Sequence, residues 1–249
     1  MRTAILTSYF SKKKHPNDPR DPSVTGRLPS GFIENNASNY IDEWYNSVTK
    51  LDLEGYIFHD NLSVEFQNTY KNNKIKFIKV NDSHWSNLDY RWFCYQDFLK
   101  SNTFDYVFMT DCSDVVVVQD PTKLQDDFPD ADFFLCQDSL MLNEFPYLQF
   151  HQRFNLNDSV WFMLNQNQLA LINMGVIGGN YNNITLFLET YSKFRQSLKH
   201  PEFAQADMYV GQYVFRRLLS EKKIILGEPV CSEFKKYQTD RKDVYFIHK

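Results

Sequence analysis

The sequence has no run of about eighteen apolar residues, the length that a membrane-spanning helix needs. Its first ten residues, MRTAILTSYF, also lack the long apolar segment of a secretory signal peptide. We therefore expect a soluble, cytoplasmic chain. An excess of basic residues is missing too: the formal net charge is −4 and the pI is about 5.9, whereas nucleic-acid-binding proteins usually present a basic face. The charge therefore argues against a nucleic-acid partner.

Cysteine and glycine are also scarce, and each scarcity argues against a class of site. The four cysteines, Cys94, Cys112, Cys136 and Cys231, are scattered without the spacing of a metal site. Because a secreted or luminal chain is expected to show paired cysteines or a leader, we predict reduced thiols. Neither Gly-x-Gly-x-x-Gly nor Gly-Lys-Ser/Thr occurs, which excludes a dinucleotide-binding or Walker-type site.

The chain does contain enough apolar and aromatic residues for one large domain. At 249 residues it can bury a sizeable core, and we predict a single domain over residues 1–249. Its 22 Phe and 15 Tyr suit a packed core and a pocket that stacks on flat or ring-shaped ligands. Short apolar runs alternate with segments of helical period. This alternation predicts an α/β fold with a central, mostly parallel sheet flanked by helices.

The predicted strands are short runs rich in β-branched and aromatic residues, and the predicted helices have apolar residues three or four positions apart. The strands are Thr3–Phe10, Tyr56–His59, Ile75–Val80, Phe104–Met109, Val115–Val118, Ala131–Cys136, Leu169–Asn180 and the C-terminal run VYFIHK. The helices begin at Ser38, which can cap the first of them, at Asp89 and at Asp207, and a further helix is marked by Phe187, Tyr191, Phe194 and Leu198.

The most informative stretch is FDYVFMTDCSDVVVVQDP, residues 104–121. An apolar strand is followed by Asp111 and Asp114. Open α/β sheets bind ligands at the carboxyl ends of their strands, which is where these two aspartates lie. Two like charges a few ångströms apart repel by roughly 1 kcal/mol in water and about 4 kcal/mol near a protein surface. A divalent cation turns that repulsion into attraction, and hard oxygen ligands suit Mg²⁺ or Mn²⁺. The alternative is that Asp111 caps a turn while Asp114 is solvated.

This stretch resembles the metal-binding segment of GT-A glycosyltransferases, which use nucleotide-sugar donors. The family's usual motif is Asp-x-Asp, followed by a short apolar strand and another Asp. Counted back from Asp120, Asp114 matches the second Asp of that motif, and Cys112 occupies the first position. Asp111, one residue earlier, gives the Asp-x-x-Asp variant of some relatives. The resemblance implies a GT-A (Rossmann-like) fold, a bound Mn²⁺ or Mg²⁺ and a nucleoside-diphosphate-sugar donor.

The resemblance also implies a metal and phosphate site built from distant parts of the chain. His248, in the C-terminal segment, would be the third metal ligand beside Asp111 and Asp114, and Asp111 would also contact the donor. Arg91 lies in an Asp-Tyr-Arg segment that matches some relatives, and its planar guanidinium would bind the donor diphosphate. Lys249 would lie near the phosphates.

The nucleoside is implied to bind at the loop after the first strand. In the family this loop contacts the base and the ribose, which implicates Thr7, Ser8 and Tyr9. The polar, Pro-rich residues 11–37 follow, and a loop of this length is usually mobile or functional. Arg20 and Arg27 make it a candidate lid over the diphosphate.

The donor sugar and the reaction centre are implied to involve Asp138, Asn173 and Asp207. Asp138 follows the Asp pair by about two dozen residues, and Asn173 begins an Asn-x-Gly segment of the kind that contacts the sugar in the family. Asp207 occupies the place of an acidic residue that reaches the reaction centre. Residues 139–165 are irregular and rich in aromatic and amide side chains, which suits an acceptor surface or an aromatic wall of the core.

Several of these residues also have an ordinary structural interpretation. Thr7 to Tyr9 can form a plain strand end, and Arg91 can be a surface residue paired with a carboxylate. Asp207 suits a helix-capping position. A histidine next to a chain end is commonly solvated, but the apolar run before His248 predicts a docked tail.

Together the motifs predict a metal-dependent hexosyl- or pentosyltransferase that moves a sugar, with a UDP-linked donor favoured, to a carbohydrate or glycoprotein acceptor. The order of motifs favours retention over inversion, although Met208 replaces a Gln of retaining relatives.

Three alternatives stay open. A Mg²⁺-dependent phosphatase of the haloacid-dehalogenase type has its Asp pair spaced Asp-x-Asp after the first strand. A glycoside hydrolase uses more widely separated carboxylates and needs no metal. A nucleotide-sugar-binding protein without turnover is the third, and Cys112 in the motif is its best argument. Metal-dependent release of a nucleoside diphosphate separates the transferase from all three.

Overall fold

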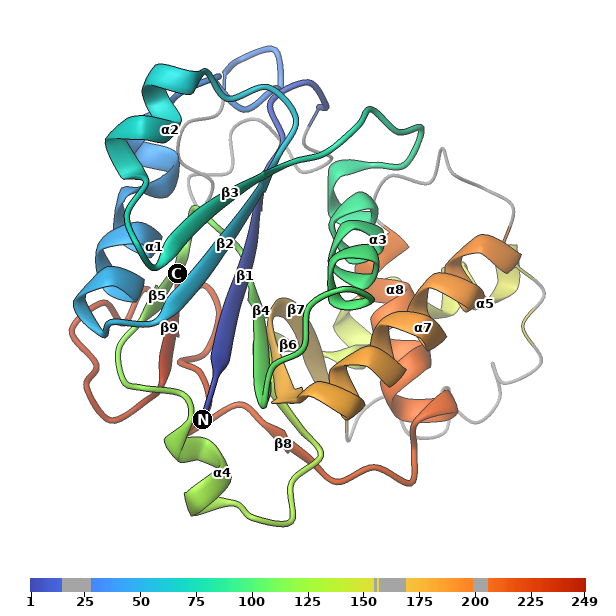
Figure 1. Ribbon diagram of the computed structural model, residues 1–249. Helices are drawn as coiled ribbons and strands as arrows, with labels where there is room; N and C mark the ends of the chain where they lie inside the picture. Colours follow the sequence, from blue (N-terminus) through green and yellow to red (C-terminus); the bar gives the residue numbers. More distant parts are fainter. Residues whose placement is uncertain (15–27, 155, 157–168, 199–205) are drawn as a thin grey trace.

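The chain forms a seven-stranded mixed sheet with helices on both faces (Figure 1). The computed structural model describes residues 1–14, 28–154, 156, 169–198 and 206–249. In order across the sheet, the strands are β3 (Ile75–Lys79), β2 (Glu54–His59), β1 (Thr3–Tyr9), β4 (Tyr106–Thr110), β7 (Ala170–Asn180), β6 (Phe133–Met141) and β8 (Ile224–Leu226). All neighbouring strands are parallel except that β7 runs antiparallel to β4 and β6. The predicted mostly parallel α/β sheet is therefore confirmed.

Helices on the two faces enclose separate cores (Figure 1). One face carries α1 (Ser38–Lys50) and α2 (Val64–Tyr70), and the other carries α3 (Asn87–Leu99), α5 (Tyr147–Arg153), α7 (Tyr181–Ser197) and α8 (Ala206–Tyr213). The short elements are α4 (Lys123–Asp127), the 3-10 turn η1 (Leu142–Glu144) and the π-helical segment η3 (Val214–Leu218). Because side chains alternate along a strand, Ala4 and Leu6 of β1 join the α3 side while Ile5 joins the α1 side.

A second, two-stranded sheet lies on the α1 side of the main sheet (Figure 1). It pairs β5 (Val115–Val117) antiparallel with β9 (Phe246–His248). Val115, Val117 and Phe246 are buried in the α1-side core, which explains why this short pair docks there. Both strands were predicted, β5 as Val115–Val118 and β9 as part of the C-terminal run. The predicted docking of the chain end is confirmed, because β9 pairs with β5. Across the described residues, no helix is long and apolar enough to span a membrane.

Two local predictions are wrong. The first helix is preceded by Ala37 at its cap position and has no side-chain cap, because Ser38 is already helical. Asp138 was expected after the end of a strand but lies inside β6, because β6 continues past an irregularity in its pairing with β7 that begins at Cys136.

The two predicted loops are only partly described. In the segment 139–165, residues 142–153 contain η1 and α5, so this part is helical rather than irregular. Residue 155 and residues 157–165 of the expected acceptor surface lie outside the described residues. Arg20 and Arg27 of the expected lid also lie outside them. Both functional interpretations stay predictions.

A disulfide joins Cys136 on β6 to Cys231, with a Cα–Cα distance of 5.3 Å. The prediction of reduced thiols is therefore wrong for this pair. The two cysteines are 95 residues apart and meet because β8 pairs with β6, which cysteine spacing does not reveal. Cys94 and Cys112 are free and buried. Because disulfides persist in oxidising compartments, the cysteines no longer support a cytoplasmic location.

A buried ion pair joins α3 to α7, and its loss should be costly. Asp89 lies 3.1 Å from the guanidinium of Arg195, and the hydroxyl of Tyr191 donates to Asp89 at 2.8 Å. We expect Asp89→Ala to lower the free energy of unfolding by about 3–5 kcal/mol, because it removes a carboxylate that faces a buried cation. Urea denaturation measures this. The control Asp97→Ala, which removes an exposed pair with Lys100, should cost less than about 1 kcal/mol. Equal losses would contradict the expectation.

Candidate active site and metal centre

Asp111 and Asp114 follow the carboxyl end of β4, as predicted. The N–H of Asp111 donates to the carbonyl of Gly175 on β7 at 2.8 Å, which ties the turn after β4 to the neighbouring strand. Asp114 is 5% exposed, and its carbonyl accepts a hydrogen bond from the N–H of Lys249 at 3.0 Å. The Asp pair therefore lies where β4, β7 and the C-terminal residues meet.

His248 reaches the Asp pair because β9 pairs with β5, in a register that places Val115 opposite His248. Its Nε2 lies 3.6 Å from Asp114 Oδ2 and 3.8 Å from Asp111 Oδ2. Ligand atoms of all three side chains lie within 4.8 Å of one another. The structure thus brings together the three residues predicted to bind the metal.

These side chains fit a hard divalent cation. Among the described residues, Asp114 Oδ1 and both ring nitrogens of His248 are buried without a hydrogen-bond partner, which is costly. Burial raises the pKa of Asp114, and His248 only partly offsets the shift. Two ligands of one Mg²⁺ lie at most about 4.2 Å apart, twice the usual bond length. The distances of 3.6 and 3.8 Å fall within that limit. Mg²⁺ or Mn²⁺ would give Nε2 of His248 and the buried carboxylate of Asp114 the partner that they lack.

Space at this centre depends on Gly175. A Cβ at this position would lie 2.1 Å from Cε1 of His248 and 2.9 Å from Oδ2 of Asp111. No Cβ approaches other atoms so closely, so only glycine allows the imidazole and the carboxylate to meet here. The Asn-x-Gly pattern identifies this glycine, but the docking of β9 gives it its steric role.

Arg91 lies in α3, is 4% exposed and links two carboxylates. It forms ion pairs with Asp111 and, at 3.2 Å, with Asp207, and it donates to the carbonyl of Met174 at 3.3 Å. Burial acts to lower the pKa of Arg91, but Asp111 and Asp207 hold it above its ordinary value. Arg91 therefore joins the predicted metal-site carboxylate to the predicted reaction-centre carboxylate. Its contact with a diphosphate stays a prediction.

Asp207, in the first turn of α8, should make stability depend on pH. It is 2% exposed, and burial raises its pKa from 3.8 to about 6 against the opposing effect of Arg91. The folded state therefore binds the carboxyl proton of Asp207 more tightly than the unfolded state does. The free energy of unfolding should fall as the pH rises from the ordinary pKa of an aspartate to the raised pKa of Asp207. Relative to Asp207→Asn, the metal-free wild type should lose roughly 2–3 kcal/mol of unfolding free energy between about pH 4 and pH 6. Denaturant titrations at several pH values measure this, and parallel curves would contradict it.

Asp138 and Asn173 are hydrogen-bonded to each other beside the metal centre. Asn173 Nδ2 donates to Asp138 Oδ2 at 3.0 Å, and Asn173 Oδ1 accepts the N–H of Gly175 at 2.8 Å. Asp138 Oδ1 accepts the N–H of Leu140 at 3.2 Å. Both side chains are 6% exposed. The two predicted sugar contacts are thus brought together, with one link to Gly175.

The three residues predicted to contact the nucleoside lie in β1 itself, at its carboxyl end, and their side chains are mostly engaged within the protein. Thr7 is buried and donates to the carbonyl of Thr110 at 3.0 Å. Tyr9 is buried as well, and its hydroxyl donates to the carbonyl of Glu34 at 2.5 Å. Ser8 is partly exposed. Contacts of these three residues with a nucleoside stay predictions.

Two further residues at the site were not identified from the sequence. Phe234 packs on His248, with 4.2 Å between the ring centroids and 37° between the ring planes. Glu43 on α1 forms an ion pair with Lys249, whose predicted place near phosphates is untested. Neither residue belongs to a motif, and local periodicity does not distinguish them from other aromatic or acidic residues.

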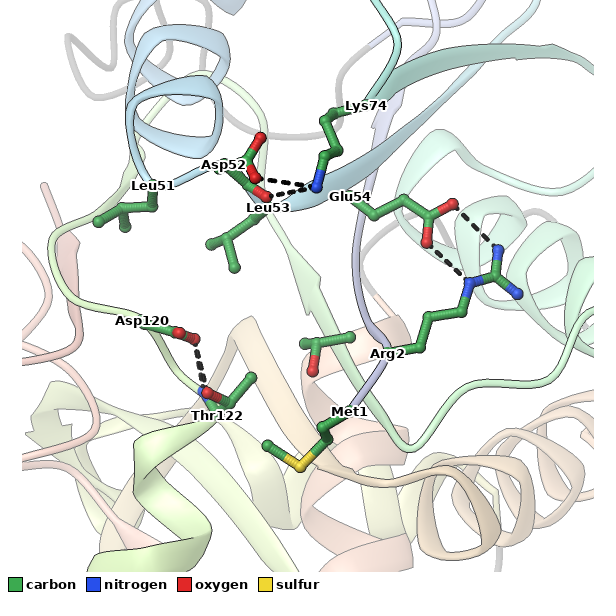
Figure 2. Close-up of a pocket in the computed structure, with 10 residues that line it drawn as sticks. Met1, Arg2, Leu51, Asp52, Leu53, Glu54, Lys74, Asp120 and Thr122 are labelled. Atoms are coloured by element: carbon green, nitrogen blue, oxygen red, sulfur yellow. Dashed lines mark hydrogen bonds and ion pairs between the residues drawn. The ribbon is translucent and has the colours of Figure 1, made fainter.

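A separate cavity of about 420 Å³ lies near the amino ends of β1 and β2, opposite the metal centre along the strands (Figure 2). Four of its charged side chains form two ion pairs, Arg2 with Glu54 at 2.9 Å and Lys74 with Asp52 at 3.0 Å, and Asp120 accepts the N–H of Thr122 at 3.0 Å. Because each of these charged groups already has a partner within the protein, the cavity shows no chemistry that selects a ligand. We assign it no function.

Comparisons with known proteins agree with this architecture. No protein-family model and no curated protein matches the sequence. The crystal structure of the galactosyltransferase LgtC with donor and acceptor sugar analogues aligns over 98% of this chain and 86% of that chain, with 13% identity and a TM-score of 0.56. An active-site mutant of LgtC aligns over the same shares, with 12% identity and a TM-score of 0.55. Similarity at this identity establishes the fold rather than the activity. The chain therefore has the GT-A glycosyltransferase fold.

Proposed function

We propose that this chain is a metal-dependent glycosyltransferase that moves a sugar from a nucleoside-diphosphate donor, with UDP the favoured nucleotide, to a carbohydrate or glycoprotein acceptor. The observation that carries the proposal is the convergence of Asp111, Asp114 and His248, with unpartnered buried ligand atoms, in a chain of GT-A fold. LgtC is named a galactosyltransferase, so a hexose donor is the first to test.

Asp111, Asp114 and His248 would hold Mn²⁺ or Mg²⁺. When bound, the cation supplies positive charge that stabilises the departing diphosphate. Arg91 is already adjacent to Asp111, so its guanidinium would add positive charge on the same side. Lys249 immediately follows the third ligand and would reach the phosphates by leaving Glu43.

Asp138, Asn173 and Asp207 would bind the sugar and acceptor hydroxyls. The first two are hydrogen-bonded to each other and offer carboxylate and amide groups, the usual partners of sugar hydroxyls. Asp207 is linked to the metal-site carboxylate through Arg91. In the reaction, the bond between the anomeric carbon and the diphosphate oxygen breaks, and the acceptor oxygen bonds to that carbon as its hydroxyl proton leaves with the released nucleoside diphosphate. The order of motifs favours retention of configuration.

A thermal-shift panel tests the donor site. UDP-, GDP-, CMP- and dTDP-linked sugars are compared with Mn²⁺ and with EDTA. We expect one nucleotide class to raise the melting temperature only with metal. A donor at about 100 times its Kd stabilises by about 2.7 kcal/mol, which corresponds to roughly 5–10 °C for a chain of this size. Adding candidate acceptors should then release nucleoside diphosphate in a metal-dependent reaction.

Other outcomes of the same panel identify the alternatives. Stabilisation by a phosphomonoester with release of inorganic phosphate would identify a phosphatase. Stabilisation by free sugar without metal would favour a glycoside hydrolase. Metal-dependent donor binding without release of nucleoside diphosphate, with any acceptor and in water, would favour a binding protein.

A further inference from the structure

The Cys136–Cys231 disulfide lies directly against the proposed metal centre. Its two sulfur atoms and a ring nitrogen of His248 all lie within 4.8 Å of one another. The three residues are at most 1% exposed, so the disulfide and the imidazole are packed together in the interior. The disulfide is therefore a neighbour of a metal ligand as well as a link between chain segments.

The same disulfide anchors the segment that supports β9. The N–H of Phe246 donates to the carbonyl of Val230 at 2.9 Å, and the N–H of His248 donates to Ser232 Oγ at 3.0 Å. Cys231 lies between these two supporting residues and forms a parallel bridge with Phe246. The backbone that carries His248 is therefore hydrogen-bonded to a segment that is covalently fixed at its centre.

This anchor matters because β9 is not a strand of the main sheet. Within the described residues, β9 forms a ladder with β5 and, apart from it, only the isolated bridge to Cys231, so β5 and β9 make a separate sheet. Cys136 lies on β6 of the main sheet, opposite Asn173 of β7. The disulfide thus connects the support of the metal-ligand strand to the strands that carry the predicted sugar contacts.

The imidazole of His248 lacks the support that most metal-binding histidines have. Such a histidine usually donates its second ring N–H to a carboxylate or carbonyl, which sets the orientation of the ring. In the described part of the chain, Nδ1 of His248 has no hydrogen-bond partner. Packing holds the ring instead: Phe234, the backbone at Gly175 and the disulfide are its close neighbours. If one of these neighbours moves away, the imidazole of His248 should therefore no longer be held in the orientation that metal binding needs.

We propose that the Cys136–Cys231 disulfide is a positioning element of the metal centre and makes its affinity for Mn²⁺ depend on the redox state. The inference rests on the proposed function, because it takes Asp111, Asp114 and His248 as the metal site. A trialkylphosphine reduces the disulfide: phosphorus takes the oxygen of one water, the S–S bond breaks, and the two hydrogens of that water leave on the two thiols. The separated sulfur atoms then move apart, which changes both the packing on His248 and the anchor of its supporting segment.

The test is the affinity for Mn²⁺ alone, measured from the electron paramagnetic resonance signal of free Mn²⁺. Oxidised protein is compared with protein that has been reduced by the phosphine and desalted without oxygen. Reduction should weaken binding by about tenfold or more, the range for lost support of a metal ligand. Reoxidation should restore the affinity. The double variant Cys136→Ser/Cys231→Ser should bind as weakly without any reductant, and Cys94→Ala should behave as wild type in both states.

His248→Ala shows whether the effect passes through the imidazole. The variant binds Mn²⁺ more weakly from the start, but reduction should change its affinity by less than about twofold if the disulfide acts by positioning His248. Equal affinity of oxidised and reduced wild type would overturn the proposal, and so would an equal loss on reduction in His248→Ala. Loss of the near-ultraviolet circular dichroism on reduction would also overturn it, because the disulfide would then hold the whole fold.

The same titration separates this inference from the proposed function. If oxidised wild type binds Mn²⁺ no better than Asp111→Asn/Asp114→Asn, the metal centre itself is refuted and the inference fails with it. If the oxidised protein binds well and the reduced protein binds equally well, only the positioning role is refuted.

Discussion

Replacing Asp114 by alanine is expected to reduce Mn²⁺-dependent sugar transfer by about 10²–10³-fold or more, the cost of removing one group that stabilises charge in a transition state. Asp114 is one of the three proposed metal ligands, and its Oδ2 lies 3.6 Å from Nε2 of His248. In the described residues no other carboxylate is grouped with Asp111 and His248 in this way. Release of nucleoside diphosphate at fixed donor and Mn²⁺ concentrations measures the loss.

The same variant should be no less stable than wild type when metal is absent. Burial raises the pKa of Asp114, so its ionised form costs folding free energy at neutral pH. Alanine removes that cost and the partnerless Oδ1 together. The melting temperature in EDTA should therefore be equal or higher, while the increase caused by Mn²⁺ and donor disappears. A lower melting temperature in EDTA would mean that Asp114 is mainly structural.

Asp120→Ala is the matched control. Asp120 belongs to the same stretch, but its carboxylate accepts the N–H of Thr122 at 3.0 Å in the turn before α4. We expect a small loss of stability, about 1 kcal/mol, and an unchanged response to Mn²⁺. If Asp120→Ala lost the response as completely as Asp114→Ala, the assignment of the metal ligands would be wrong.

Replacing Gly175 by alanine is expected to weaken Mn²⁺ binding by tenfold or more and to reduce transfer in parallel. The new methyl group would lie 2.1 Å from the imidazole of His248 and 2.9 Å from a carboxylate oxygen of Asp111. One ligand or the other must therefore move. Two titrations measure the effect: Mn²⁺ binding without donor, and donor binding at saturating Mn²⁺.

Gly178→Ala controls for the cost of adding a methyl group to β7. A Cβ there would lie 2.1 Å from the ring of Phe108, in the core below the site. Overpacking of this kind should lower the free energy of unfolding by about 1–3 kcal/mol without touching a metal ligand. We expect Gly178→Ala to keep the Mn²⁺ affinity of wild type. Equal affinities in wild type and Gly175→Ala would show that the glycine does not limit the metal centre.

The sequence by itself determined the class of fold and the place of the Asp pair. The run Phe104–Met109 contains most of β4, and Leu169–Asn180 matches β7 almost residue for residue. Asp111 and Asp114 can be placed at a strand end because they directly follow such a run, and distance from a strand end is local information. Asn173 and Gly175 are identified in the same way. Local pattern therefore predicts which residues are available to a site.

The tertiary structure alone decided which of these residues meet. His248 joins the Asp pair because β9 pairs with β5, and Arg91 turns inward between two carboxylates instead of facing solvent. Cys136 and Cys231 form a disulfide because β8 lies beside β6, although their spacing in the sequence suggests free thiols. The physical reason is that periodicity reports which face of an element is apolar. The docking of elements far apart in the chain is set by how those faces pack, and that packing brings together the residues of the proposed metal centre.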